Sequence, residues 1–172
     1  CLVGSEMCIR DRTKDPYSAS LYYIALHKHS ILASLFKVGK QDSLASFFLR
    51  DFSQDIHQKA AMKNAYVLLS RHEYFKAAGF LLLANKQSEA IQVLIKNYHD
   101  PQLALFISVI LEGDSSSTYQ FILNTHMNQV AQYTQDVYLQ AIIAWCNQDY
   151  VSALHSLLSF FDPNQFTGEC NS

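Results

Sequence analysis

Histidine, cysteine and carboxylate side chains are the groups in this sequence that could hold a metal ion or carry out acid–base chemistry. The closest histidine pair, His27 and His29, is two residues apart, and on a helix such residues point to different faces. Cys146 and His155 flank a predicted turn, but they lack the second Cys or His pair that a structural zinc site needs. We therefore expect no catalytic residue and no metal ligand.

Patterns for binding nucleotides or nucleic acids are equally weak. All five glycines are isolated, so no glycine-rich loop could cradle the phosphates of a cofactor. Basic and aromatic residues do alternate along one stretch, at Arg50, Lys59, Lys63, Tyr66, Arg71, Tyr74, Phe75 and Lys76. Because Asp51, Asp55 and Glu73 interrupt this set, a solvated helix face, or a basic edge that meets an acidic protein partner, is favoured over nucleic-acid binding. We expect no cofactor and no nucleic-acid partner.

The composition indicates a chain with a sizeable core. Of its 172 residues, 49% are hydrophobic and only 16% are charged, and a chain of this length buries roughly 70% of its extended surface. The formal charge of −2 gives no general attraction to nucleic acid or to anionic membranes. The longest run without a polar side chain, residues 77–84, is far shorter than the roughly 20 residues of a membrane span. Of Cys1, Cys8, Cys146 and Cys170, only Cys146 lies in a helical pattern, which favours a reduced, cytosolic compartment.

Apolar residues recur at helical spacing along almost the whole chain, and no strand alternation is long enough to compete. Asp15-Pro16 and Asp100-Pro101 each place a capping residue before a proline at the first helical position. Gly39 and Gly113 stand where glycine commonly ends a helix. The helices predicted up to Gly113 cover residues 16–29, 30–38, 43–49, 54–70, 73–84, 88–98 and 102–112. Two further helical patterns follow, and a last helix begins after a turn at residues 147–149.

The apolar faces predict how these helices pack. Gly79 costs about 1 kcal/mol relative to alanine in a helix interior, so we expect another helix to cross closely there. Phe47 and Phe48 are expected to fill the junction to the following helices, and Tyr138 and Trp145 to lie in the core. Residues 54–70 carry apolar side chains on two sides, which predicts packing on both. These are Ile56, Ala60, Ala65 and Leu68 on one side and Met62, Tyr66 and Leu69 on the other.

Two helical turns share one pattern. Residues 82–91 and 145–154 each combine an apolar helix end, a polar turn, and an alanine followed by a branched aliphatic residue. Ala78, Gly79 and Ala90 are the small residues expected where helices touch, and each such unit buries its apolar face only by stacking on the next. The sequence therefore predicts an all-α fold, an α-solenoid of antiparallel helical hairpins that is similar to tetratricopeptide and clathrin repeats but irregular in period.

The two ends differ from the rest of the chain. Residues 1–12, CLVGSEMCIRDR, show no helical or strand period, and we interpret them as a translated sequencing adapter, with a natural disordered N-terminus as the alternative. Residues 162–172 consist of turn-forming residues without a closing element, which predicts a loop or a truncated tail. We interpret residues 13–161 as an α-solenoid segment, a fragment of a larger scaffold.

Several runs of residues, in order, carry a resemblance to a known family. They are DP at 15–16, YYIAL at 22–26, KAAMKNAYVLL at 59–69, AAGFLLLA at 77–84, EAIQV at 89–93 and DPQLAL at 100–105. This region resembles the helical part of the DmX-like or rabconnectin family, the large subunits of the RAVE complex. Beyond residue 113 the likeness is that of a generic solenoid.

The resemblance implies a very large cytosolic scaffold that carries WD40 propellers N-terminal to an α-solenoid and works in the reversible assembly of the vacuolar-type proton ATPase. The implied partners are peripheral-sector subunits of that ATPase and other RAVE subunits, and the implied location is cytoplasmic, peripheral to vacuolar or endosomal membranes. The family offers no catalytic residues and assigns no partner-binding residues. Another trafficking scaffold, of the coat or intraflagellar-transport type, is the alternative, and an all-α enzyme or a nucleic-acid-binding repeat is less well supported.

Overall fold

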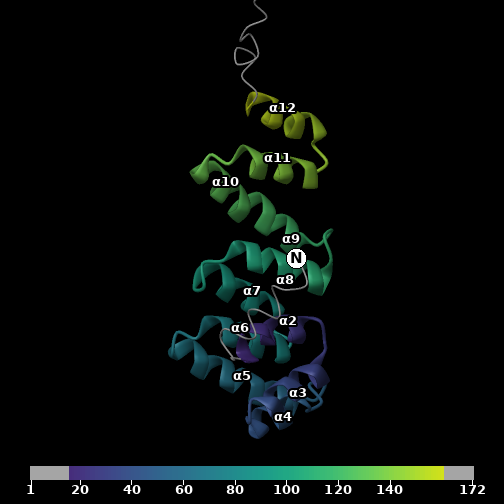
Figure 1. Ribbon diagram of the computed structural model, residues 1–172, viewed down its shortest axis with the longest axis vertical. Helices are drawn as coiled ribbons and strands as arrows, with labels where there is room; N and C mark the ends of the chain where they lie inside the picture. The colour runs from purple at the N-terminus through teal and green to yellow at the C-terminus, as the bar shows by residue number, and fades with distance from the viewer. Residues whose placement is uncertain (1–15, 161–172) are drawn as a thin grey trace, which may run out of the picture. The chain divides into compact units, whose positions relative to one another are not determined.

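The computed structural model describes residues 16–160, and within this range the regular secondary structure is entirely helical. The chain divides into two compact units, Cys1–Gly113 and Asp114–Ser172, which we describe one after the other (Figure 1). In both units, helices that follow each other in the chain pack together as hairpins. The predicted fold class, an all-α arrangement of helical hairpins of the solenoid type, is confirmed.

Unit 1 is built from short helices joined by tight turns. In chain order its described elements are η1 (Pro16–Ala19), α2 (Ser20–Ala25), α3 (His29–Val38), α4 (Asp42–Phe48), α5 (Asp55–Ser70), α6 (Tyr74–Leu83), α7 (Gln87–Lys96) and α8 (Pro101–Glu112). Helices α3 and α4 pack together, as do α5 and α6, α6 and α7, and α7 and α8. Helix α2 leaves this sequential order, because it packs on α6 and also touches α8. Helix α6 is therefore enclosed by α2, α5 and α7.

The contact between α2 and α6 depends on a glycine. A Cβ atom placed on Gly79 would lie 3.2 Å from Cδ1 of Ile24 and 4.0 Å from Cδ1 of Leu21, so even an alanine would require the Ile24 side chain to shift by a few tenths of an ångström. Ile24 and Leu21 of α2 are both buried at this crossing. The close crossing predicted at Gly79 is confirmed, and the helix that crosses there is α2.

Aromatic side chains join α3 and α4 to α6. Phe47 and Phe48 are both buried, and their ring centroids lie 5.6 and 5.9 Å from that of Phe80. Phe48 also lies 5.0 Å from Phe36 of α3. The prediction that Phe47 and Phe48 fill this junction is confirmed.

Helix α5 is covered on one side only. Ala61 and Ala65 are its buried residues, and they belong to the face that meets α6. Ile56 is 75% exposed, and Tyr66 is exposed as well. The prediction of packing on two sides is wrong, because no described helix covers the second face of α5.

The hairpin turns use residues other than glycine in the left-handed conformation. These residues are His27, Lys40, His72, Asn85, His99, Gln135 and Gln148, with φ between 53° and 62°. His27 ends the first predicted helix early, so that α2 stops at Ala25 and α3 begins at His29. Gly39, expected in this role, has φ −76°, and Lys40 takes the left-handed position instead, which corrects that prediction.

Six of these turns, all but the one at His99, close with the same pair of backbone hydrogen bonds. After α6, the Lys86 N–H donates to the Leu81 carbonyl at 2.9 Å and the Asn85 N–H to the Leu82 carbonyl at 3.0 Å. This pair of bonds defines a Schellman motif, which satisfies the last carbonyls of a helix within a very short turn. Short turns of this kind force consecutive helices to run antiparallel.

Capping at the start of α8 follows the sequence signal. The Asp100 carboxylate accepts a hydrogen bond of 2.9 Å from the Leu103 N–H, and Pro101 occupies the first helical position. Gly113, with φ 87°, follows the helix. Both predictions for this helix are confirmed.

The described part of unit 2 consists of one continuous helical segment, with a π-helical turn in its middle, and one hairpin. Helix α9 (Ser117–Phe121), the π-helical turn η2 (Ile122–Met127) and α10 (Asn128–Thr134) follow without a break, and α11 (Val137–Cys146) and α12 (Tyr150–Phe160) form the hairpin. The Asn147 amide donates to Oδ1 of Asn124 at 2.6 Å, which ties the hairpin turn to η2. The residues buried in this unit are Tyr119, Ile122, Leu123, Met127, Ala131, Ala141, Ile143 and Ala153.

The predicted boundaries at the two ends fall outside the described residues. This holds for the proposed adapter at residues 1–12, for Asp15 as a cap, and for the tail at residues 162–172. The division into these segments and a solenoid at 13–161 stays a prediction.

Candidate protein-interaction surfaces

The hairpin of α11 and α12 presents apolar side chains to solvent. Within each helix these residues are spaced three, four or seven apart, and so share one side. We call them the hairpin face, and they are Tyr138, Ile142, Trp145, Tyr150, Leu154 and Leu158. The rings of Trp145 and Tyr150, with centroids 4.9 Å apart, join the two stripes at the turn.

The hairpin face corrects a prediction. Tyr138 and Trp145 were expected in the core, but they are 56% and 63% exposed. Ala141 and Ile143 of the same helix are the residues that are buried instead. A contiguous exposed apolar surface of this kind is typical of a site that binds another protein.

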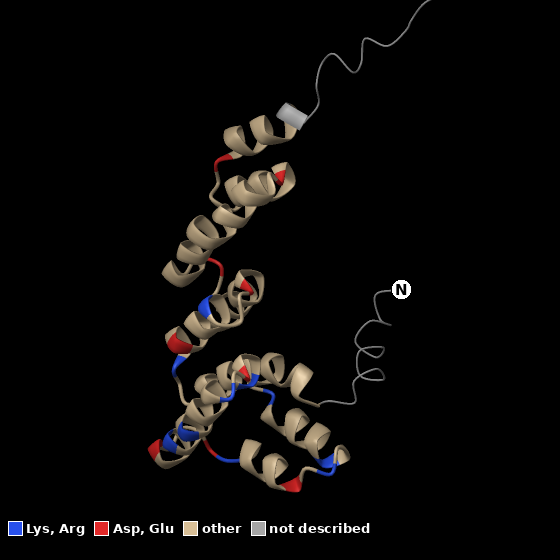
Figure 2. Ribbon diagram, turned by 90° about the vertical axis from the view of Figure 1, so that its left-hand side faces the viewer, with Lys and Arg blue, Asp and Glu red and all other residues tan. Residues whose placement is uncertain are grey.

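Charge separates the two units. All 13 Lys and Arg residues lie before residue 114, together with 10 of the 15 Asp and Glu residues. Unit 1 thus has a formal charge of +3 and unit 2 one of −5. In the described part of unit 2, Figure 2 shows Asp and Glu residues but no Lys or Arg, and these acidic residues all lie near helix ends. The hairpin face therefore lies in a unit that offers no cation to a partner.

A second set of aromatic residues, three exposed and one half-buried, lies on unit 1. We call Tyr22 of α2, Phe75 of α6, Tyr98 after α7 and Phe106 of α8 the aromatic patch. Ring centroids are 6.3 Å apart for Tyr22 and Phe75, 6.0 Å for Tyr22 and Phe106, and 5.8 Å for Phe75 and Tyr98. The patch exists because α2 lies across α6 and reaches α8.

The Tyr22 hydroxyl is held in its neutral form. Burial raises the pKa of Tyr22, and the negative charge of Asp100 and the neighbouring Tyr98 raise it further. A neutral phenol at the edge of an apolar patch can donate a hydrogen bond to a bound partner.

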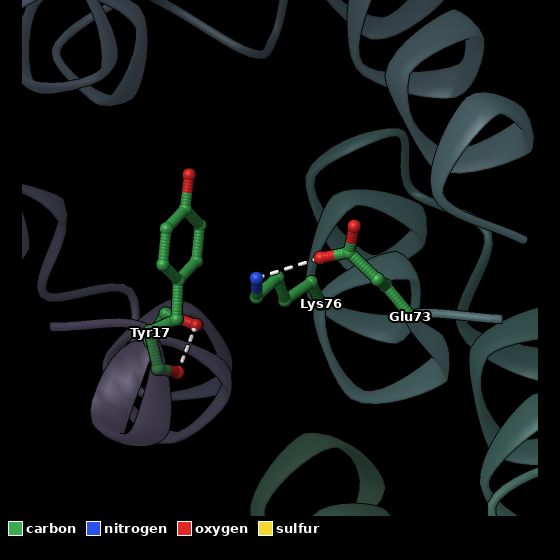
Figure 3. Close-up of polar contacts among 4 residues, drawn as sticks. Tyr17, Glu73 and Lys76 are labelled. Carbon is green, nitrogen blue, oxygen red and sulfur yellow. Dashed lines mark hydrogen bonds and ion pairs between the residues drawn. The ribbon is translucent and has the colours of Figure 1, made fainter. Parts of the chain in front are cut away.

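Two basic residues of unit 1, Lys59 and Lys76, have acidic partners on its own surface. Lys76 lies 2.6 Å from the Glu73 carboxylate, and its Nζ is 4.4 Å from the ring centroid of Tyr17 (Figure 3). The hydrogen bond and charge of Lys76 lower the pKa of Glu73. Lys59 pairs with Asp55 at 2.5 Å. This is the arrangement of a solvated helix face, and the expectation of no nucleic-acid partner stays a prediction.

The histidine and cysteine candidates do not assemble into a metal site. Within residues 16–160, no three His, Cys, Asp or Glu side chains come together as metal ligands would. Cys146 ends α11 and His155 lies in α12. His27 and His29 do not share a helix as expected, because the left-handed turn at His27 separates them from α2. Their rings instead approach to 6.1 Å between centroids.

Buried Tyr119 and half-buried Cys146 form a pair that the sequence did not suggest. Burial, a hydrogen bond with the Cys146 side chain, and the charges of Cys146 and Asp114 raise the pKa of Tyr119 to about 12. Cys146 is a free cysteine. The pair ties α9 to the end of α11, and no sequence pattern links residues 27 positions apart.

None of the helices in residues 16–160 is both long enough and apolar enough to cross a membrane.

These features define a helical-repeat protein with exposed apolar faces, and comparison with known proteins shows its family. The sequence profile described as RAVE protein 1 C terminal matches residues 6–167. The chain belongs to this family. The resemblance seen up to residue 113 is confirmed and extends through unit 2. The match begins at residue 6, which lies inside residues 1–12. The interpretation of residues 1–12 as a translated adapter therefore stays a prediction.

Individual relatives agree with the profile. The chain is 32% identical over 154 residues to the "Regulator of V-ATPase in vacuolar membrane protein 1" of Saccharomyces cerevisiae, covering 87% of this chain and 11% of that protein. It is 30% identical over 160 residues to "DmX-like protein 1" of Mus musculus, covering 86% of this chain and 5% of that protein. The protein of the same name as the first in Schizosaccharomyces pombe is 31% identical over 150 residues, covering 85% of this chain and 12% of its own length. The chain thus spans only 5% to 12% of these relatives.

Proposed function

We propose that this chain is a non-catalytic protein-interaction segment of a regulator of vacuolar-type proton ATPase assembly. The observation that carries the proposal is the family match over residues 6–167. Two relatives in that family, from Saccharomyces cerevisiae and Schizosaccharomyces pombe, are named for regulation of the V-ATPase in the vacuolar membrane. The segment would act in the cytoplasm and reach vacuolar or endosomal membranes through its partners.

The hairpin face supports a binding role. Aromatic and large aliphatic residues are enriched in the cores of protein interfaces, and Trp and Tyr contribute much of the binding free energy there. Trp145, Tyr138 and Tyr150 provide three such side chains on one hairpin. We assign this face to a peripheral-sector subunit of the ATPase or another RAVE subunit. Because residues 114–172 contain no Lys or Arg, the matching surface is expected to be apolar with basic residues around it.

The small share of each relative that the chain covers supports the interpretation as a fragment. We propose that residues 13–161 are one stretch of a longer α-solenoid. Repeats of this type bury their faces against neighbours, so the aromatic patch of unit 1 is a second candidate for contacts with other parts of the assembly.

The test uses the full-length protein that contains this segment, expressed in cells that lack their own copy. Trp145→Ser combined with Tyr150→Ser removes the anchor of the hairpin face. We expect at least a tenfold loss of co-purified peripheral-sector subunits, because truncation of an interface hot spot costs about 2 kcal/mol or more. The membrane-bound fraction of those subunits, measured by fractionation, should fall with it.

A matched control comes from the same unit. Tyr133 is 92% exposed and lies on α10, outside the hairpin face, so Tyr133→Ser should leave co-purification unchanged. Full co-purification by the Trp145→Ser and Tyr150→Ser variant, or an equal loss by the control, would contradict the assignment of the hairpin face.

A further inference from the structure

A cavity of about 420 Å³ lies within unit 1, where the ends of several helices converge. Its wall comes from α2, the turn before α3, the loop between α4 and α5, the start of α5, the turn between α6 and α7, and the last turns of α6 and α8. This volume falls in the range of about 300–1,000 Å³ that is typical of ligand sites. The residues that line the cavity belong neither to the hairpin face nor to the aromatic patch.

One wall carries two histidines, of which His29 has an unused nitrogen. Nδ1 of His29 is buried and has no hydrogen-bond partner in the described part of the chain. Buried polar atoms of this kind are rare, and an additional water or ion is one of the explanations for them. Burial and then the charge of His27 lower the pKa of His29, so the imidazole is neutral at pH 7 in the empty cavity.

The other charged groups on the wall are Arg50 and Asp51. The Asp51 carboxylate is already occupied, because it accepts hydrogen bonds from the Ser53 N–H at 3.0 Å, the Ser53 hydroxyl at 2.7 Å and the Gln54 amide at 3.3 Å. Its pKa is lowered by those bonds, and to a small extent by nearby His57. Arg50 stacks on Phe47 at 5.1 Å and has no carboxylate within 4.0 Å among residues 16–160.

The remaining wall is uncharged. The side chains contributed by α2, α5, α6, α7 and α8 are aliphatic or amide groups. Ile24, Leu82, Leu83 and Leu111 add apolar side chains to the wall. The cavity thus combines one unpaired guanidinium and two imidazoles with an apolar surface, which suits an anion attached to an apolar neighbour better than a bare inorganic ion.

We propose that this cavity binds the carboxylate of a Glu or Asp side chain, next to an apolar residue, in a short segment of a partner protein, and that His29 takes up a proton on binding. The inference rests on the proposed function only in taking the partner to be a protein. The carboxylate accepts hydrogen bonds from protonated His29 and from Arg50, and the apolar neighbour packs on Leu82 and Leu111.

The proposal predicts the direction of the pH dependence. A bound carboxylate favours the imidazolium form and raises the pKa of His29. The complex then holds more protons than the free partners, so affinity rises as pH falls from about 8 to about 6. His27 also lines the cavity.

The experiment is calorimetric titration of the full 172-residue chain with the peptide acetyl-Leu-Glu-Leu-amide, in buffers of different ionisation enthalpy. We expect binding that is about tenfold tighter near pH 6 than near pH 8, with uptake of up to one proton per histidine involved. Acetyl-Leu-Gln-Leu-amide, which lacks the charge, should bind about tenfold more weakly than the Glu peptide near pH 6. Inorganic phosphate should bind more weakly than the Glu peptide.

Variants separate the cavity from the rest of the chain. His29→Gln should abolish most of the pH dependence and proton uptake, and Arg50→Gln should weaken binding about tenfold at both pH values. The control His155→Gln changes an exposed histidine of unit 2 and should have no effect. Should His29→Gln fail to fold, the NMR titration of His29 in the unaltered chain gives the same information, because its pKa must rise when the Glu peptide binds.

Three results would overturn the proposal: equal binding of the Glu and Gln peptides, phosphate binding as tight as the Glu peptide, or peptide binding without proton uptake. None of them bears on the hairpin face. Co-purification of ATPase subunits with Trp145 and Tyr150 variants therefore tests the proposed function independently.

Discussion

The hairpins α6–α7 and α11–α12 share a turn but differ in what covers them. Asn85 and Gln148 take the left-handed position with φ 57° and 62°. Each turn closes with the same 2.9 Å backbone bond, from Lys86 to Leu81 and from Asp149 to Ala144. Yet α6 is enclosed by α2, α5 and α7, whereas α11 exposes Trp145 and Tyr138. A local turn signature determines that two helices pair, and it does not determine what the pair packs against.

Charge adds to this difference. Unit 1 carries all of the Lys and Arg residues and places aromatic residues both in its core and on its surface. Unit 2 has only acidic charges, and most of its large apolar residues on α11 and α12 are exposed. Unit 1 therefore covers more of its apolar helix faces, whereas unit 2 leaves an apolar face exposed that a partner could cover.

The largest expected effect tests the covering of α6. Leu81 of α6 is 1% exposed and Ile142 of α11 is 57% exposed. Leu81→Ala should lower the free energy of unfolding by about 3 kcal/mol, whereas Ile142→Ala should lower it by less than about 1 kcal/mol. Urea denaturation of the full chain followed by circular dichroism measures both. Equal losses would show that the hairpins are covered to the same degree.

The exposed hairpin face should also promote association. Two chains at high concentration can cover each other's apolar surface, and Leu154→Glu should reduce the association constant about tenfold or more, because burying a leucine contributes about 1.5–3 kcal/mol. Sedimentation equilibrium measures this constant. Val38→Glu, at an exposed position in unit 1, is the control. A similar reduction by the control would mean that charge alone, and not the hairpin face, governs association.

A smaller effect is expected at the two matched turns. Glycine adopts positive φ without the cost of about 1–2 kcal/mol that other residues incur, and part of this gain is lost to the greater freedom of the unfolded chain. Gln148→Gly should therefore raise the unfolding free energy by about 0.5–1 kcal/mol. Asn85→Gly should raise it less, because Asn tolerates this conformation. Thermal unfolding compares the two, and a larger gain at Asn85 than at Gln148 would contradict the expected order.

The smallest effect at neutral pH concerns Tyr119. Its pKa is raised to about 12 in the folded chain, against about 10 in an unfolded chain. The folded state thus favours the neutral phenol, and the stability from this group is complete below pH 10 and is lost as pH rises toward 12. Tyr119→Phe should make alkaline denaturation less steep while leaving stability at pH 7 nearly unchanged. An unaltered alkaline profile would show that Tyr119 ionises normally.

Local signals in the sequence were reliable where a single residue type has one physical use. Asp100-Pro101 predicted a capped helix, and the carboxylate does accept the Leu103 N–H. Gly79 predicted a close crossing, because glycine destabilises a helix interior and a closely packed neighbouring helix offsets that cost. Gly39 shows the limit, since the left-handed position moved by one residue to Lys40.

The candidate sites were largely beyond prediction. An aromatic stripe such as Tyr138 and Trp145 has the same helical spacing whether a neighbouring helix covers it or not. The cavity depends on the meeting of His29, Arg50 and Leu111, which are far apart in the chain. Local sequence patterns cannot predict contacts between residues that are far apart in the chain. The contact between Tyr119 and Cys146 could not be predicted for the same reason.

The sequence by itself determined the helices, most of their ends, the all-α class and the family resemblance, because helical spacing, caps and short turns act within a few residues. The tertiary structure alone decided that α2 crosses α6, that α11 and α12 leave an apolar face exposed, and that His27 and His29 border a cavity with Arg50. The reason is that burial is a property of the neighbours an element finds in space, and those neighbours lie many residues away along the chain.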